Sequence, residues 1–161
     1  MRVLVMIGTV FFLLIGTAFA KSPVAGDKAP DFSVQTMDGA KVSLTNFKDK
    51  VVLVGMFHIC APCRNQALEL EKVQANFKSD KLAIIGINTS GDSKEAVTEY
   101  INGFPSKISF PYYLDPNMTV HKAYKQRDMP TVLIIGTDGN LLARIPSVGA
   151  DQLIPYLEKI L

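Results

Sequence analysis

The stretch of residues 51–64, VVLVGMFHICAPCR, decides the fold. Its first seven residues form an apolar run of strand length that is rich in valine, which is typical of a central strand buried on both faces. Cys60 and Cys63 follow, separated by two residues. Over residues 61–77 apolar side chains recur at steps of three and four, which predicts a helix with one apolar face. The two cysteines therefore lie where a buried strand passes into a helix.

Further strands and helices are predicted on both sides of this unit. Asp38-Gly39 and Asp138-Gly139 are hairpin turn signals, because glycine accepts a positive φ. Strand–helix–strand crossovers join parallel strands, whereas the late hairpin adds an antiparallel pair. We therefore expect an α/β fold with a mixed central sheet flanked by helices and an N-terminal β-hairpin extension. The expected strands are 31–36, 41–44, 51–57, 82–87, 110–113, 131–135 and 141–145, and the expected helices are 61–77, 93–102, 117–124 and 151–161.

The first twenty residues differ from the rest of the chain. After Met1-Arg2, residues 3–19 carry no charge, and the stretch ends in Ala18-Phe19-Ala20. This pattern predicts a signal peptide over 1–20, cleaved after Ala20, and one domain over 21–161. An uncleaved membrane anchor is the alternative, because the apolar run is near the lower limit for spanning a bilayer. In either case we expect an exported, periplasmic or otherwise extracytoplasmic domain.

Composition limits the class of protein. The chain has 161 residues, of which 48% are hydrophobic and 20% are charged, so a single domain with a real core is expected rather than a disordered chain. The net charge of +2 is spread along the sequence, which argues against a nucleic-acid partner.

The spacing of the two cysteines favours chemistry over a structural role. A bridge between Cys60 and Cys63 would close a very small loop and stabilise the fold little. Thiol-disulfide exchange needs an attacking thiolate and a second thiol that resolves the mixed disulfide, and a helix N-terminus favours a negative sulfur. A structural bridge, an inert pair, or a metal site completed by His58 or His121 are the alternatives. Neither histidine has the spacing of a zinc module, and no metal or cofactor is expected.

Several motifs together resemble a known family. Residues 51–64 resemble the active-site strand and helix of the thioredoxin superfamily. Ala29-Pro30-Asp31-Phe32 and the stretch 42–47, VSLTNF, are similar to the TlpA/ResA-like branch of that superfamily. Met129-Pro130-Thr131, followed by a strand and a hairpin, resembles its cis-proline loop. The resemblance covers essentially all of residues 21–161 and implies a thioredoxin-like fold.

The resemblance also implies roles for individual residues. Cys60 would be the exposed nucleophile and Cys63 the buried resolving thiol. Pro130 would be a cis-proline packed beside the cysteine pair. Met129 would offer its backbone to a substrate peptide as a short strand pairing.

The chain departs from the family around the first cysteine. It has no tryptophan, and Ile59 stands where the family usually has one. Val54 occupies the strand position where thioredoxins keep a buried aspartate. His58 replaces a small or polar residue, and we expect His58 and Pro62 to contact the substrate at the rim of the site. A protonated His58 would also favour the Cys60 thiolate.

An acidic residue lies in a stretch that some relatives share. Gly91-Asp92-Ser93-Lys94 resembles the family's Gly-Glu-Ser-Lys-like segment, which implies that Asp92 could transfer a proton to Cys63. The other interpretation is that Asp92 is a helix N-cap, with Glu95 completing a capping box.

These observations predict an exported thiol-disulfide oxidoreductase that exchanges disulfides with client proteins. The resemblance implies a reductant fed by a membrane-bound electron donor, with a role in cytochrome c maturation for some relatives. We also expect a monomer. A peroxiredoxin-like peroxidase is the second hypothesis, because the motif at residues 29–32 also occurs in that family. However, this chain lacks the Pro-x-x-x-Thr-x-x-Cys pattern of the peroxiredoxin site. The third hypothesis is a non-catalytic module that binds partners at the groove beside Met129 and Pro130.

Overall fold

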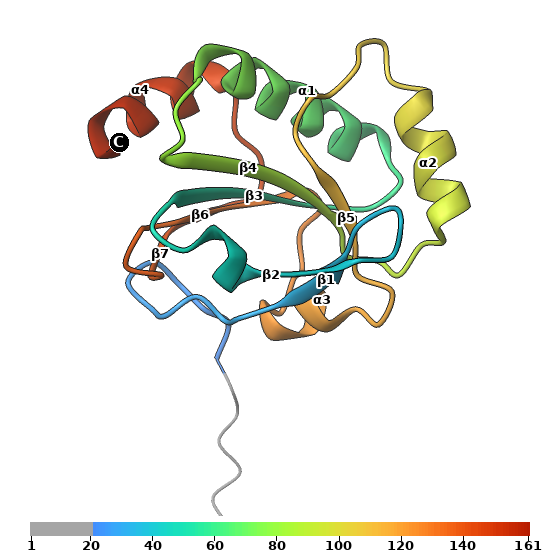
Figure 1. Cartoon of the computed structure of the whole chain (residues 1–161), viewed down its shortest axis with the longest axis horizontal. Helices are drawn as coiled ribbons and strands as arrows, with labels where there is room; N and C mark the ends of the chain where they lie inside the picture. The colour runs from blue at the N-terminus through green and yellow to red at the C-terminus, as the bar shows by residue number, and fades with distance from the viewer. Residues whose placement is uncertain (1–20) are drawn as a thin grey trace, which may run out of the picture.

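The computed structural model describes residues 21–161, so the predicted signal peptide over 1–20 lies outside the described residues. The described part forms one seven-stranded sheet with helices on both of its faces (Figure 1). The strands are β1 (Ser33–Gln35), β2 (Lys41–Ser43), β3 (Val51–Phe57), β4 (Leu82–Asn88), β5 (Tyr112–Leu114), β6 (Thr131–Ile135) and β7 (Leu141–Ile145). The helices are the 3₁₀ helix η1 (Leu44–Phe47), α1 (Ala61–Asn76), α2 (Lys94–Asn102), α3 (Thr119–Ala123) and α4 (Ala150–Ile160).

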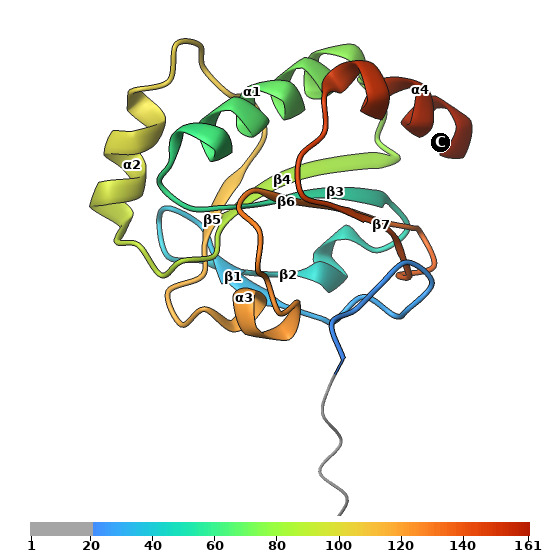
Figure 2. The same cartoon turned by 180° about the vertical axis from the view of Figure 1, so that it is seen from behind.

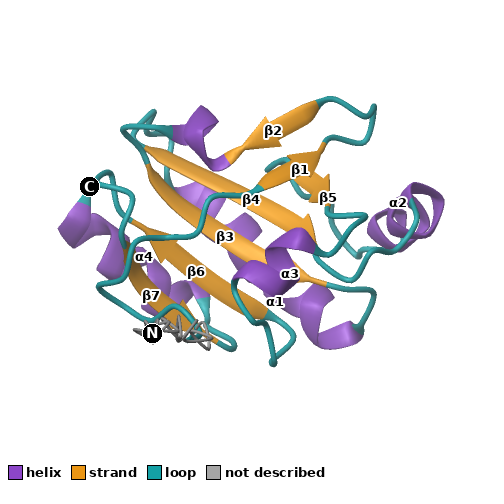
Figure 3. Ribbon diagram, turned by 90° about the horizontal axis from the view of Figure 1, so that it is seen from below, coloured by secondary structure: helices purple, strands orange, loops and turns teal. Residues whose placement is uncertain are grey.

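The strand order is β2-β1-β5-β4-β3-β6-β7, which places β3 inside the sheet. Strands β3, β4 and β5 run parallel, whereas β6 and β7 pair antiparallel beside β3. The hairpin of β1 and β2 joins the far edge through a single residue pair, Gln35 with Leu114. Figure 3 shows the strands side by side from below. The predicted mixed sheet with an N-terminal hairpin extension is therefore confirmed.

The apolar run of β3 is continuous because both faces of the strand are covered. Leu53 and Phe57 pack into the core beneath α1 and α4. Val52, Val54 and Met56 point to the opposite face, into the core that α3 and the N-terminal segment cover. Figure 2 shows α1 and α4 on one side of the sheet and α3 on the other. A strand in this position has no solvent-facing side chain, and β3 therefore shows no polar alternation.

Local hydrogen bonds and proline shorten several elements relative to the sequence prediction. Residue 44 was expected in a strand, but the side chain of Asn46 accepts a hydrogen bond from the Ser43 N–H at 2.7 Å and the chain turns into η1. Strand β5 starts only after Pro111, which has no N–H to pair. Helix α3 starts at Thr119, because Met118 adopts a left-handed conformation.

Pro155 lies inside a helix but outside the first turn, where proline is most easily accommodated. Helix α4 begins at Ala150, so Pro155 is its sixth residue and lies beyond the first turn. The proline leaves the carbonyl of Asp151 without a helical donor. Both residues are exposed, so water can satisfy that carbonyl. Within residues 21–161, none of the helices combines the length and the apolar character needed to cross a bilayer.

Candidate active site

The two cysteines lie at the junction of β3 and α1, as the sequence predicted. Cys60 is the N-cap of α1, and its sulfur accepts a hydrogen bond from the backbone N–H of Cys63 at 3.2 Å. Pro62 lies in the first turn, where a missing N–H removes no helical hydrogen bond. Both cysteines are free thiols. The helix start thus presents a backbone N–H to the sulfur of Cys60, an arrangement that stabilises negative charge there.

The two sulfurs have different environments. Cys60 is partly exposed, whereas Cys63 is 1% exposed. The Sγ of Cys63 accepts from the backbone N–H of His58 at 3.5 Å. Burial raises the pKa of the Cys63 thiol to about 12, and its hydrogen bond to Cys60 contributes in the same direction. The pair therefore combines an accessible sulfur with a buried one that holds its proton at neutral pH.

Two tyrosines that the sequence did not single out for the site belong to its surroundings: Tyr100 contacts Cys60, and Tyr112 lies in the same core cluster as Cys63. The hydroxyl of Tyr100, from α2, donates to the backbone carbonyl of Cys60 at 2.6 Å. Burial raises the pKa of Tyr100 above its usual range, so the hydroxyl remains a donor. Tyr112 is buried and stacks on Phe57, with ring centroids 5.9 Å apart. Tyr100 lies within the predicted helix 93–102, but the sequence did not link it to the cysteines.

The loop before β6 lies at the same end of the sheet. The Met129–Pro130 peptide bond is cis, as the family resemblance implied. Thr131 pairs with Met56, so Pro130 lies beside the end of β3, just before the chain reaches the cysteines. Pro130 is buried, and Met129 is partly buried against the core cluster that includes Cys63.

A buried glutamine that sequence reasoning missed fixes this loop. The side-chain N–H groups of Gln126 donate to the carbonyls of Met56 and Asp128, each at 3.2 Å. Its carbonyl oxygen accepts from the Thr89 hydroxyl at 2.6 Å. One side chain thus joins the end of β3, the residue that follows β4 and the cis-proline loop. No pattern marks Gln126 in the sequence, since a single glutamine is usually exposed.

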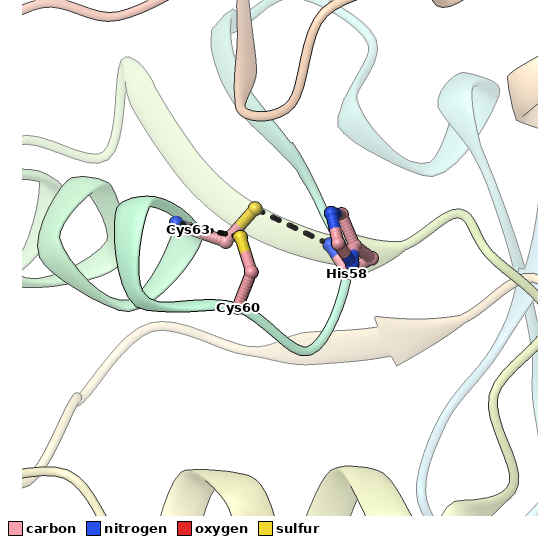
Figure 4. A group of neighbouring side chains, drawn as sticks. All are labelled: His58, Cys60 and Cys63. Carbon is pink, nitrogen blue, oxygen red and sulfur yellow. Dashed lines mark hydrogen bonds between the residues drawn. The ribbon is translucent and has the colours of Figure 1, made fainter.

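His58 is brought to the cysteine pair. One ring nitrogen of His58 and the sulfurs of Cys60 and Cys63 all lie within 4.8 Å of one another. Figure 4 shows the three side chains side by side where β3 runs into α1. His121 lies apart from this group, on α3. Of the two histidines, only His58 therefore belongs to the site.

The capping interpretation of Asp92 was wrong. Ser93 is the N-cap of α2, and its side chain accepts from the Ala96 N–H at 3.2 Å. The carboxylate of Asp92 instead accepts from the side-chain amide of Asn88 at 2.8 Å. Asn88 ends β4 and pairs with Phe57, the last residue of β3. Asp92 is therefore anchored at the end of the inner strands β3 and β4, where the chain leaves the sheet toward the cysteines.

The fold and the paired thiols define a thiol-disulfide oxidoreductase of the thioredoxin superfamily, and related proteins agree. The chain is 26% identical to the thiol-disulfide oxidoreductase ResA of Bacillus subtilis, over 94% of this chain and 84% of ResA. It is 33% identical to the thioredoxin-like protein YneN of the same organism, over 71% of this chain and 66% of YneN.

Solved structures of similar fold carry the same kind of description. A thiol:disulfide interchange protein DsbE from Chlorobium tepidum superposes with a TM-score of 0.71 at 26% identity, covering 86% of this chain and 95% of that one. The thioredoxin domain of a thiol-disulfide oxidoreductase from Bacteroides vulgatus gives 0.74 at 26% identity, covering 86% and 98%. Residues 25–144 match the AhpC/TSA family, and the chain belongs to this family as a TlpA/ResA-like member of the thioredoxin superfamily.

Proposed function

We propose that the protein exchanges disulfides with client proteins, with Cys60 as the nucleophile and Cys63 as the resolving thiol. The observation that carries the proposal is the difference between the sulfurs: one is accessible at the start of α1 and the other is buried beside it. The Cys60 thiolate attacks a client disulfide, and the released client sulfur takes up a proton. Cys63 then loses its proton and attacks the sulfur of Cys60, which releases the second client thiol. Two electrons pass to the client, and a Cys60–Cys63 disulfide remains.

The client is proposed to bind as an extended segment along the cis-proline loop. The backbone of Met129 pairs with the segment, as in other strand-addition complexes. Pro62 and His58 flank the cysteines and contact the client on the other side. The partial exposure of His58 and Met129 beside the cysteine pair supports this arrangement.

We further propose that the protein works outside the cytoplasm as a monomeric reductant. Residues 1–20 have the pattern of an export signal, and export would deliver a domain over 21–161 to an oxidising compartment. A reductant there needs a supply of electrons, for which we propose a membrane-bound dithiol donor. Apocytochrome c, whose haem-attachment cysteines must be reduced, is a client class that fits this role.

Replacing Cys63 with serine is expected to trap clients. Without the resolving thiol, the mixed disulfide between Cys60 and the client cannot be released from within the protein. Mixed disulfides should therefore accumulate, and they can be identified by non-reducing electrophoresis and mass spectrometry of the purified complexes. The matched control is Cys60→Ser, which leaves Cys63 buried and should capture nothing. If the Cys63→Ser protein forms no mixed disulfide with any protein of its own compartment, the exchange role is contradicted.

Replacing Asp92 with asparagine is expected to slow the second step. Cys63 must lose a proton to attack, and its raised pKa makes a nearby base useful. We propose that Asp92 accepts this proton, and we expect release of the mixed disulfide to slow by roughly a hundredfold. The rate can be followed between pH 6 and pH 8 with a preformed Cys60–peptide disulfide.

The variant Ser93→Ala is the control for this experiment. It removes the cap of α2 at a cost of about 1 kcal/mol of stability and should leave the exchange rate unchanged. Wild-type rates across the pH range in Asp92→Asn would exclude the proton-transfer role.

A further inference from the structure

His58, Cys60 and Cys63 together form a possible set of metal ligands, which disulfide exchange does not require. Exchange needs two sulfurs, whereas here an imidazole nitrogen lies within 4.8 Å of both of them. Thiolate sulfur is a protein ligand that soft metal ions prefer, and imidazole nitrogen also binds copper and zinc. The three residues come from one short segment of chain and lie side by side at the start of α1 (Figure 4).

The number and type of donors select among soft ions. Within residues 21–161, no further histidine, cysteine or carboxylate lies close enough to serve as a fourth ligand. Zn²⁺ is four-coordinate, and zinc sites built from two cysteines and one histidine complete the shell with a water molecule or a substrate, so Zn²⁺ needs a fourth ligand from outside this group. Copper(I) is compatible with two or three ligands and favours thiolate sulfur. Two sulfurs and one nitrogen from the protein therefore suffice for copper(I), whereas Zn²⁺ would need a further ligand.

We propose that the reduced protein binds one copper(I) ion through the two cysteine sulfurs and a ring nitrogen of His58. Both thiols lose their protons as the sulfur–copper bonds form, and the oxidation state of copper does not change. Two thiolates, one neutral imidazole and one copper(I) ion together carry a charge of −1. This charge lies at the N-terminus of α1, a helix of 16 residues whose first backbone N–H groups favour negative charge.

The surroundings hold the ligands in place while leaving the ion a way in. Cys63 is buried and receives the His58 backbone N–H, so the position of its sulfur is fixed by β3 and α1 together. His58 and Cys60 are partly exposed, so an ion can reach the group from solvent. The Tyr100 hydroxyl donates a hydrogen bond to the carbonyl of Cys60, which limits movement of the backbone that carries this ligand. A disulfide between the cysteines would remove both sulfur ligands, and only the reduced protein should bind copper.

The test is competition for copper(I) against the coloured chelator bicinchoninate under anaerobic conditions. Reduced protein is expected to remove one copper(I) ion per chain from the chelator, and protein oxidised to the Cys60–Cys63 disulfide is expected to remove none. His58→Phe should weaken the affinity at least tenfold, because even residues that only support metal ligands cost 10- to 100-fold when they are lost, as a rough guide. X-ray absorption of the loaded wild type should show two sulfur neighbours and one nitrogen neighbour.

The second histidine provides the matched control. His121→Ala removes an imidazole from α3, outside the group, and should leave the copper affinity unchanged. Far-ultraviolet circular dichroism checks that each variant is folded. The proposal is overturned if reduced wild type leaves the chelator fully loaded, or if His58→Phe binds as tightly as wild type and absorption spectra show sulfur neighbours alone.

This inference relies on the same cysteines as the proposed function, but the two fail separately. Disulfide exchange is measured with excess chelator present, so a protein that exchanges disulfides and binds no copper refutes only the metal site. A protein that binds copper and reduces no disulfide refutes only the exchange role.

Discussion

Replacing Cys60 with serine is expected to abolish disulfide reduction. A serine hydroxyl has almost no anionic form at neutral pH and cannot form a disulfide, so the first covalent step is lost. Cys63 cannot take over, because it is 1% exposed and its pKa is raised to about 12. We expect the rate of insulin reduction to fall roughly a thousandfold or more, the scale on which loss of a nucleophile acts.

The comparison with Cys63→Ser makes the result specific. That variant should still react once with a disulfide and then stop, whereas Cys60→Ser should not react at all. Turnover that survives in Cys60→Ser would contradict the assignment of the nucleophile. Thiol-dependent consumption of peroxide that survives in Cys63→Ser would instead favour the peroxiredoxin-like function.

Replacing Phe57 with alanine is expected to destabilise the fold by about 3–5 kcal/mol. Phe57 is fully buried at the end of β3 and stacks on Tyr112. Its ring also fills the space beside Gly55, where a Cβ would lie 2.2 Å from the ring carbon Cζ. Urea unfolding measures the loss, and Leu142→Ala, at a residue 36% exposed, is the control with a small expected effect.

The close packing of Phe57 and Gly55 can be tested by combining substitutions. Gly55→Ala alone should destabilise, because its new methyl group meets the Phe57 ring. In the Phe57→Ala background the same change enters a vacated space and should cost less, so the two effects should not add. A Phe57→Ala cost below about 1 kcal/mol, or strict additivity of the two substitutions, would contradict this account of the core.

Much of the fold could be predicted because its signals are local. The run of β3 and the apolar face of α1 identify the central strand and the helix that follows it. The hairpin signals at Asp38-Gly39 and Asp138-Gly139 correspond to turns with a positive φ at each glycine. By contrast, the rule that keeps proline in the first turn of a helix fails at Pro155, because this helix surface is exposed and water can satisfy the freed carbonyl.

The features that were missed depend on contacts between distant parts of the chain. Gln126 holds residues that lie up to 70 positions away in the sequence. Asp115 is 1% exposed and accepts from the backbone N–H groups of Thr119 and Val120, which fixes the start of α3. Asp92 resembles a helix cap in sequence, yet the adjacent Ser93 is the cap. Which residue caps a helix or holds a loop depends on where the sheet places each backbone group, and sequence periodicity does not contain that information.

The hydrogen bond from the Cys63 N–H to the Cys60 sulfur links redox chemistry to folding through a thermodynamic cycle. A thiolate accepts this bond more strongly than a disulfide sulfur does, so the bond favours the reduced protein over the disulfide whenever the Cys60 sulfur is ionised. If the reduced and the disulfide form differ in their free energy of unfolding, the reduction potential of the folded protein shifts accordingly. About 1.4 kcal/mol of difference corresponds to a shift of about 30 mV. The reduction potential of the protein therefore depends in part on the strength of the N-cap hydrogen bond of α1.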